Sequence, residues 1–166
     1  MSIYVIAEIG INHNGSLETA KQLIDAAKEA GCDAVKFQKR TIEAVYTADE
    51  LAKPRDSVFG ATNGDLKRGL EFSRDQYVQI NAYCQQGNIS WSGSAWDRGS
   101  VDFLSAYRLP FLKIPSALIT NLELLREYRA TDIPLFLSTG MSTWEEIDQA
   151  VALLSTGVPL TLLHCH

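Results

Sequence analysis

The sequence lacks the features of membrane, secreted and nucleic-acid-binding proteins. No apolar run in its 166 residues is long enough to span a bilayer. The first residues, MSIYVIAEIG, have no basic segment and carry Glu8 where a signal peptide would be apolar. The formal net charge is −5, and a negative surface does not suit phosphate backbones. We therefore expect neither a membrane nor a nucleic acid as a partner.

Cysteine is also scarce. Cys32, Cys84 and Cys165 have no metal-ligand spacing and are odd in number. We interpret them as reduced thiols of a cytoplasmic protein. The remaining composition, 46% hydrophobic and 21% charged, is typical of an ordinary globular domain, and the length allows one domain with a substantial core.

Strand and helix patterns alternate along the chain. Six strands are expected in the segments YVIAEIG, DAVKFQ, ISWSGSAW, FLKIPSAL, IPLFLSTG and VPLTLLHCH. Five helices follow the first five strands, and their expected N-caps are Ser16, Ser73, Asp97, Thr120 and Ser142. Ser73, Thr120 and Ser142 each precede a Gln or Glu at capping-box spacing, and Phe72 and Tyr77 have the spacing of a hydrophobic staple. Such alternation with short connections predicts parallel βα units.

Two architectures fit this alternation. A doubly wound sheet would normally carry G-x-G-x-x-G after its first strand, and EIGINHNG does not have that arrangement. The other is the TIM (β/α)₈ barrel, which needs roughly 250 residues. We therefore expect an α/β fold that contains only the N-terminal portion of a barrel. The connection from about Lys39 to Glu71 is read as one long loop, either functional or a plain surface excursion.

Polar residues gather at the C-terminal ends of the expected strands. Lys36 and Lys113 lie inside apolar strands, where an unpaired ammonium is costly. In a barrel these ends converge on one mouth. Two lysines with several hydroxyl groups would suit a multiply charged anion such as phosphate. The polar residues at these ends are Glu8, Lys36, Gln38, Ser92, Ser94, Lys113, Ser116, Ser138, Thr139, His164 and His166.

Each of these residues also has a purely structural interpretation. A lysine can extend to the sheet edge or pair with a carboxylate, and Glu8 can serve only as that partner. Serines are common at strand ends that precede a helix. His13 either orients its loop or touches a substrate, and His164 with His166 does not make a convincing zinc site. A Schiff-base lysine, as in a class I aldolase, fits the same residues, and so does a truncated, non-catalytic barrel that binds a phosphorylated ligand.

Five segments resemble the sialic acid synthase family, the N-acetylneuraminate synthases and their relatives that make other nonulosonic acids. The segments are IAEIGINHNGSLETAKQLIDAAKEAGCDAVKFQ, SAWDRGSVDFL, LKIPSALITNLELL, LSTGMSTWEEIDQAV and LLHC. The resemblance runs from Tyr4 to Cys165. It implies that residues 1–166 are the N-terminal part of a (β/α)₈ catalytic domain, without the rest of the barrel and a C-terminal antifreeze-like domain. It also implies a homodimer.

The resemblance further implies a condensation of phosphoenolpyruvate with N-acetylmannosamine or a related amino sugar, assisted by a divalent metal, Mn²⁺ or Mg²⁺. Matching the family residue by residue assigns Glu8 and Lys113 to catalysis. It assigns Gln38 and Asn63 to the sugar. The positions matched to phosphoenolpyruvate are Lys36, Ser94, Lys113, Ser116 and Ser138.

Departures from the family pattern leave the sugar open. Many relatives carry an acidic residue where this chain has Ala117 and Leu118, and threonine then proline where it has Ser94 and Ala95. The family's metal-binding histidines lie on later strands. We therefore expect no metal ligands in this chain, and we expect the 166-residue chain alone to be inactive.

Overall fold

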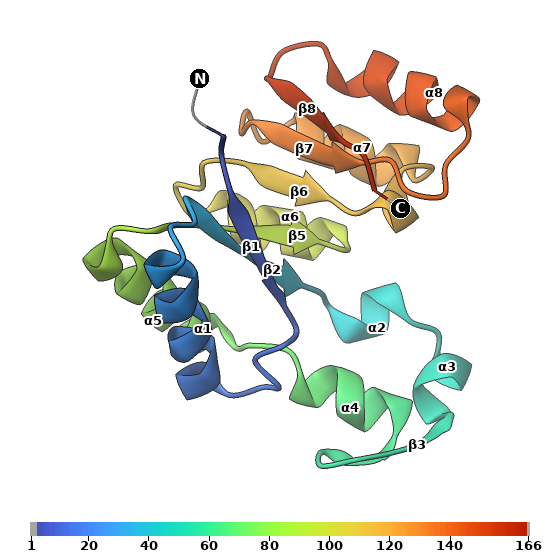
Figure 1. Cartoon of the computed structure of the whole chain (residues 1–166). Coiled ribbons are helices and arrows are strands. Elements are labelled where there is room, and N and C mark those ends of the chain that lie inside the picture. The colour runs from blue at the N-terminus through green and yellow to red at the C-terminus, as the bar shows by residue number, and fades with distance from the viewer. Residues whose placement is uncertain (1–2, 166) are drawn as a thin grey trace. The chain divides into compact units, whose positions relative to one another are not determined.

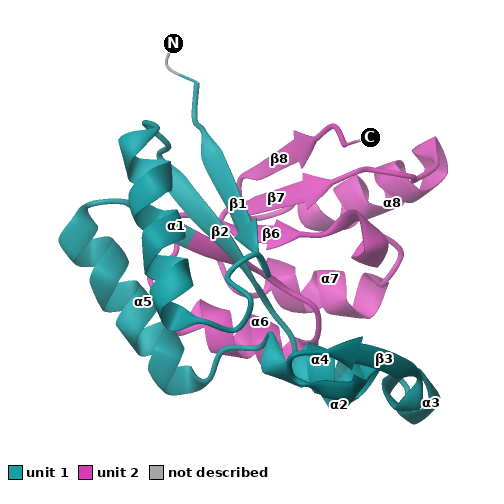
Figure 2. Ribbon diagram, turned by 60° about the horizontal axis from the view of Figure 1, so that its bottom comes forward, with its two compact units in different colours: residues 1–91 teal, residues 92–166 magenta. Residues whose placement is uncertain are grey.

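The computed structural model describes residues 3–165, and the chain divides into two compact units after Trp91 (Figure 2). The described residues contain eight α-helices, one 3₁₀ helix and eight strands. Within residues 3–165 no helix has the length and apolar character needed to cross a membrane. His166, expected at the end of the last strand, lies outside the described residues.

The first unit begins with two parallel strands and the two helices that follow them in βα order (Figure 1). Ser90, the first residue of a third strand, donates its N–H to the carbonyl of Asp33 at 3.3 Å, next to the start of the second strand. Helices α1 and α5 pack against each other. These elements are β1 (Ile6–Gly10), α1 (Leu17–Glu29), β2 (Ala34–Lys39), α5 (Arg74–Gly87) and β5 (Ser90–Ala95).

Local sequence explains where these helices begin and end. The Ser16 side chain accepts the N–H of Thr19 at 3.1 Å and starts α1, as predicted. Gly31, with φ +81°, follows the last turn of α1 in the left-handed conformation that glycine tolerates best. The capping box of Ser73 and Gln76 at the start of α5 is also confirmed.

The core of the first unit is aromatic. Phe37 of β2 contacts Phe72, Tyr77 and Trp91, with ring centroids 6.3 to 6.5 Å apart. Phe72 and Tyr77, which flank the start of α5, lie edge to face at 6.1 Å. The predicted hydrophobic staple is therefore present, and it fixes α5 against β2.

The long connection is not a plain loop, and that prediction was wrong. Residues 41–70, which we call the excursion, contain three short helices and an antiparallel strand pair. Two capping boxes, Thr47 with Glu50 and Thr62 with Asp65, start two of the helices. The elements of the excursion are α2 (Ile42–Val45), α3 (Ala48–Ala52), β3 (Pro54–Ser57), β4 (Gly60–Thr62) and α4 (Asn63–Gly69).

The boundary between the units falls within β5, and from Ser92 onward the second unit contains parallel strands in the order β5-β6-β7-β8. Ser94 of β5 lies opposite Lys113 of β6, and Lys113 lies opposite Phe136 of β7. Helix α7 contacts both α6 and α8. The remaining elements are α6 (Arg98–Ser105), β6 (Leu112–Ile114), a 3₁₀ turn (Ser116–Leu118), α7 (Leu122–Arg129), β7 (Leu135–Ser138), α8 (Trp144–Leu154) and β8 (Leu160–Leu163).

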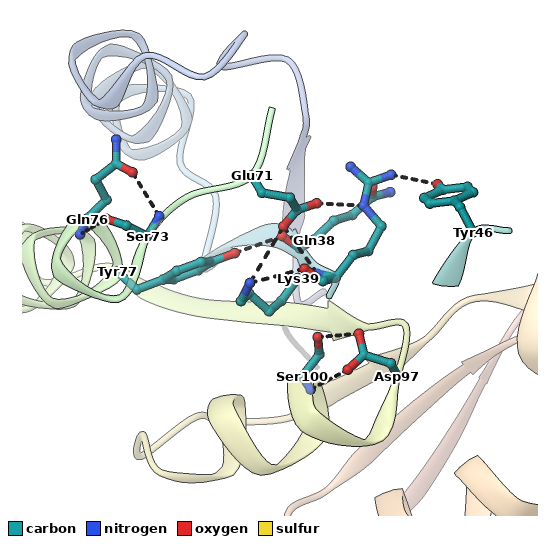
Figure 3. Close-up of polar contacts among 10 residues, drawn as sticks. Gln38, Lys39, Tyr46, Glu71, Ser73, Gln76, Tyr77, Asp97 and Ser100 are labelled. Carbon is teal, nitrogen blue, oxygen red and sulfur yellow. Dashed lines mark hydrogen bonds and ion pairs between the residues drawn. The ribbon is translucent and has the colours of Figure 1, made fainter. Parts of the chain in front are cut away.

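Two of the expected helix caps were wrong by one residue. Asp97 caps α6 as predicted, accepting the N–H of Ser100 at 2.9 Å (Figure 3). Helix α7, however, is capped by Asn121 rather than Thr120, since asparagine is the stronger N-cap residue. Helix α8 is capped by Thr143 rather than Ser142, because Thr143 and Glu146 form the box that closes.

Candidate functional site

Glu8 and Lys36 form an ion pair in the first unit. They are direct neighbours across β1 and β2, and Lys36 Nζ lies 2.8 Å from Glu8 Oε2. The Lys36 side chain is 5% exposed, whereas that of Glu8 is 56% exposed. Burial lowers the pKa of Lys36 and outweighs the opposing effect of the Glu8 charge. Glu8 therefore does pair with a lysine, and its exposure leaves its carboxylate accessible to a ligand.

Gln38 and Asn63, the two predicted sugar contacts, are held differently. The main-chain carbonyl of Gln38 accepts the hydroxyl of Tyr77 at 2.7 Å, which leaves the Gln38 side chain out of that bond (Figure 3). The Asn63 side chain donates to the carbonyl of Glu50 at 3.1 Å and so ties α4 to α3. Asn63 therefore has a structural task, and the assignment of both residues to a sugar stays a prediction.

A cluster that the sequence did not reveal closes the excursion. Arg40 Nε lies 2.6 Å from Glu71 Oε1, and the Arg40 backbone N–H donates to Glu71 Oε2 at 3.2 Å (Figure 3). Lys39 Nζ is 3.8 Å from the same carboxylate. Arg40 is 4% exposed. The partners are 31 positions apart in sequence, so no local pattern could have paired them. One carboxylate thus holds both ends of the excursion together.

His13 orients its loop. It is 2% exposed, its ring stacks on Phe72 at 3.9 Å, and its Nδ1 accepts the N–H of Gly15 at 3.1 Å. Burial lowers the pKa of His13 to about 4, against a backbone hydrogen bond at Gly10 that raises it. Of the two roles considered for His13, the structure supports the loop-orienting one.

Four of the predicted anion-binding residues belong to the second unit. Ser94 and Lys113 are neighbours across β5 and β6. Ser116 starts the 3₁₀ turn after β6, and Ser138 is the last residue of β7. Ser94 and Ser138 are buried, while Lys113 and Ser116 are half-buried. Ser94 and Ser138 thus lie in the C-terminal halves of their strands, Lys113 lies at the centre of β6, and Ser116 starts the turn that follows β6.

Gly140 allows the ends of these strands to approach closely. A Cβ placed on Gly140 would lie 3.1 Å from the Cβ of Cys165 and 3.5 Å from Ser116 Oγ. A cavity of about 350 Å³ opens beside it, lined in part by Ser116, Thr120 and Ser142. A larger residue at position 140 would push Cys165 away from this end of the sheet.

Cys165 is a second residue that sequence reasoning missed. It was interpreted only as a reduced thiol, and all three cysteines are indeed free. Partial burial raises its pKa, but hydrogen bonds from Ser138 and from the backbone of Thr139 and Gly140, with the charge of Lys113, lower it overall. The same groups that depress this pKa would stabilise a bound anion.

Tyr128 positions the strand ends of the second unit. Its fully buried hydroxyl donates to the carbonyl of Ala95 at 2.6 Å and accepts the N–H of Ala95 at 2.8 Å. The carbonyl of Lys113 lies 3.1 Å from the same oxygen. Burial raises the pKa of this hydroxyl, which stays protonated. Tyr128 thus fixes the backbone next to Ser94 and at Lys113.

The histidines at the end of the chain contribute little to the candidate site. His164 is exposed and follows β8, while its expected companion His166 lies outside the described residues. Among residues 3–165, no three His, Cys, Asp or Glu side chains are grouped so that they could hold a metal ion.

These features define a class of protein, one with an α/β fold of the barrel type that carries cationic, hydroxyl and amide groups on its parallel strands. Residues 23–166 match the NeuB family. The chain belongs to the NeuB family, and the resemblance to sialic acid synthases is confirmed.

Curated relatives agree with this assignment. The chain is 43% identical over 168 residues to the N-acetylneuraminate-9-phosphate synthase of Drosophila melanogaster, covering 99% of this chain and 45% of that protein. It is 33% identical to the N,N'-diacetyllegionaminic acid synthase of Legionella pneumophila, covering 99% of this chain and 49% of that protein. The chain thus spans about half the length of the curated relatives it matches.

Solved structures confirm the fold class. The N-acetylneuraminic acid synthetase of Leptospira borgpetersenii, crystallised with citrate, superposes with a TM-score of 0.86 at 27% identity, covering 99% of this chain and 54% of that one. A truncated 3-deoxy-D-arabino-heptulosonate 7-phosphate synthase of Thermotoga maritima gives 0.67 at 12% identity, covering 98% and 50%, which shows the fold alone. The fold is α/β, with six parallel strands that correspond to a partial TIM barrel, as predicted.

Proposed function

We propose that the protein serves a nonulosonic acid synthase reaction, in which phosphoenolpyruvate condenses with the open-chain aldehyde of N-acetylmannosamine or a related amino sugar. The third carbon of phosphoenolpyruvate attacks the aldehyde carbon, and the aldehyde oxygen takes up a proton. Water adds to the second carbon, and the bond between that carbon and the phosphate oxygen breaks. The products are a nine-carbon keto acid, when the sugar has six carbons, and inorganic phosphate.

One observation carries this proposal: in a NeuB-family chain, Ser94, Ser116 and Ser138 lie towards or just after the C-terminal ends of parallel strands, with Lys113 at the centre of β6. In the second unit, the Lys113 ammonium supplies charge, and the hydroxyls of Ser94, Ser116 and Ser138 supply short hydrogen bonds to phosphate and carboxylate oxygens. The backbone amides that lower the pKa of Cys165 lie at the same end of β7. These groups would stabilise the charge that develops as phosphate leaves.

In the first unit, Lys36 and Glu8 have complementary tasks. Lys36 is held in place by Glu8, and the family resemblance matches it to phosphoenolpyruvate. Glu8 is more than half exposed, so its carboxylate can position the attacking water or exchange a proton with the aldehyde oxygen. Gln38, in the C-terminal part of β2, would contact the sugar.

The expected divalent metal does not fit residues 3–165, since they contain no group of three suitable ligands. No step assigned here to Glu8, Lys36 or Lys113 depends on it. The homodimer, the cytoplasmic location and the inactivity of the chain alone stay predictions.

Calorimetric titration with phosphoenolpyruvate tests the binding role. The proposal expects saturable binding that Lys113→Met and Ser138→Ala weaken. Ser105→Ala is the matched control, because Ser105 lies on the surface at the end of α6 and should leave binding unchanged. Binding that is equally strong in Lys113→Met and in the parent sequence would contradict the proposal.

A Schiff-base aldolase is the second candidate, because burial lowers the pKa of Lys36 as it does in amine nucleophiles. Borohydride reduction with pyruvate, followed by peptide mass spectrometry, separates the two. The proposed function predicts no adduct at Lys36 or Lys113, whereas a reduced adduct at either would favour the aldolase. A non-catalytic binder would hold phosphoenolpyruvate but release no phosphate when the complete protein is given the sugar.

A further inference from the structure

Phe59, in the turn between β3 and β4, packs against two glycines of the first unit. A Cβ on Gly69 would overlap Cγ and Cδ1 of the Phe59 ring. A Cβ on Gly15 would overlap the carbonyl oxygen of Gly69 and lie 3.1 Å from Phe59 Cζ. Only glycine at these two positions permits so close an approach. The Phe59 ring therefore joins the excursion to the loop that follows β1.

The turn directs Phe59 inwards and its neighbour outwards. Ser57 Oγ accepts the N–H of Phe59 at 3.2 Å and donates to the carbonyl of Gly60 at 3.1 Å. Phe59 is half-buried, whereas the adjacent Val58 is 93% exposed. Of two neighbouring apolar side chains, the turn thus uses only Phe59 to contact the rest of the unit.

The glycine that receives the ring belongs to a well-held part of the first unit. The Gly15 N–H donates to His13 Nδ1 at 3.1 Å, and the His13 ring stacks on Phe72 at 3.9 Å. Ser16, the next residue, caps α1. Phe59 therefore docks against a point that the βα scaffold already fixes.

The excursion is thus held in two ways. Glu71 binds the side chain and the backbone N–H of Arg40, which brings the two ends of the excursion together. Phe59 holds the hairpin of β3 and β4 against Gly69 and Gly15. Asn63, one of the predicted sugar contacts, directly follows β4 and starts α4, so it lies within the segment that these contacts hold.

We propose that Phe59 is a positioning residue for sugar binding, because it docks the excursion, and Asn63 with it, on the loop that follows the strand of Glu8. The inference rests on the proposed function and deepens it, since it names a residue that shapes the sugar site from outside. Without this contact, sugar binding would have to order the excursion, and the affinity would fall. Phosphoenolpyruvate is matched to residues outside the excursion, so its affinity should not change.

Hydrogen exchange of the backbone amides of residues 54–62 tests the docking itself. Phe59→Ala should accelerate this exchange by about 10-fold, because the contacts of the ring with both glycines are lost. Val58→Ala is the matched control, since its side chain is exposed and should leave the exchange rate unchanged. Equal acceleration in the two variants would contradict the docking.

Gly69→Ala tests the same contact from its other side. Alanine is the better helix former, so the substitution should not weaken α4, which ends at this residue. Its Cβ displaces the Phe59 ring, however, and exchange of residues 54–62 should again be faster. Gly87→Ala is the control, because Gly87 also ends a helix and a Cβ there meets nothing closer than 3.8 Å. Unchanged or slower exchange in Gly69→Ala would overturn the inference.

Calorimetry on the 166-residue chain tests the consequence for the sugar. N-acetylmannosamine should bind about 10-fold more weakly to Phe59→Ala and Gly69→Ala than to the parent chain, while phosphoenolpyruvate binds equally well. Faster exchange without a loss of sugar affinity would overturn the inference, because Phe59 would then serve stability alone. An equal loss of phosphoenolpyruvate affinity would overturn it too, since the effect would not be confined to the sugar.

The parent chain separates this inference from the proposed function. If it binds phosphoenolpyruvate but not N-acetylmannosamine, the positioning role of Phe59 is wrong and the phosphoenolpyruvate site stands. If it binds neither, the proposed function fails and the inference fails with it.

Discussion

The two units treat their cationic side chains differently. In the first unit, Lys36, Arg40 and Arg68 each meet a carboxylate at 2.6 to 2.9 Å. In the second unit, Arg98 lies 3.5 Å from Glu127 at the surface, and Lys113 lies at the end of the sheet beside serine hydroxyls, backbone amides and the thiol of Cys165. Carboxylate partners fix a buried cation and support the fold, whereas neutral donors beside a cation suit an incoming anion. In the proposed function, phosphate binding would depend most on Lys113 and the hydroxyl groups of the second unit.

Acid should affect the first unit most strongly, through His13. Its folded pKa of about 4 lies below the ordinary value of 6.5, so the unfolded chain takes up the proton first as the pH falls. The free energy of unfolding should therefore fall by roughly 3 kcal/mol as the pH falls from 6.5 to 4. Urea unfolding at several pH values measures this change in the free energy of unfolding. His13→Gln should remove most of this dependence, while His164→Gln, at an exposed site, should keep it. Identical pH profiles for the two variants would refute the assignment.

Replacing the two lysines sharpens the contrast between the units. Lys113→Met should weaken phosphoenolpyruvate binding by roughly 100-fold, the upper end for a hydrogen bond to a charged group. Lys36→Met should weaken phosphoenolpyruvate binding less, by about 10-fold, because Glu8 already offsets part of the Lys36 charge. Calorimetric dissociation constants of both variants measure these two losses of affinity. A larger loss for Lys36→Met would reverse the comparison.

Tyr128→Phe should destabilise the second unit by about 2 kcal/mol, because it leaves the buried N–H and carbonyl of Ala95 without their partner. The midpoint of urea unfolding measures this loss. Tyr83→Phe is the matched control, since the Tyr83 hydroxyl bonds Asp25 at the surface and should matter by only a few tenths of a kcal/mol. Equal shifts in the two variants would show that Tyr128 does not fix the strand ends.

The smallest expected effect concerns the helix caps. Asn121→Ala should cost about 1 kcal/mol of stability, and Thr120→Ala close to none, since only Asn121 accepts the N–H of Leu124. The same urea series measures both variants. A larger loss for Thr120→Ala would restore the capping box expected from the sequence.

The regular part of the fold was predictable from the sequence because its elements are long and their ends are marked by unambiguous residues. Ser16, Ser73 and Asp97 each cap a helix where expected. The caps of α7 and α8 were displaced because two polar residues stand side by side at each start, and only the folded backbone selects one. The excursion was missed because its elements span three to seven residues, too short for a hydrophobic period to be detected.

The candidate site was predictable only where it depends on strand position. Lys36 and Lys113 were found because a lysine inside an apolar strand is unusual. The Arg40–Glu71 pair joins residues 31 positions apart, and Tyr128 reaches Ala95 across 33 positions. Such contacts arise from tertiary packing and leave no local pattern. Cys165 was overlooked because its surroundings, rather than its spacing, lower its pKa.

A crystal structure of this protein with phosphoenolpyruvate tests the central claim most directly. The account predicts the phosphate group within hydrogen-bond distance of Lys113 Nζ and of the hydroxyl of Ser116 or Ser138. Phosphoenolpyruvate bound elsewhere, with these three side chains left untouched, would contradict it.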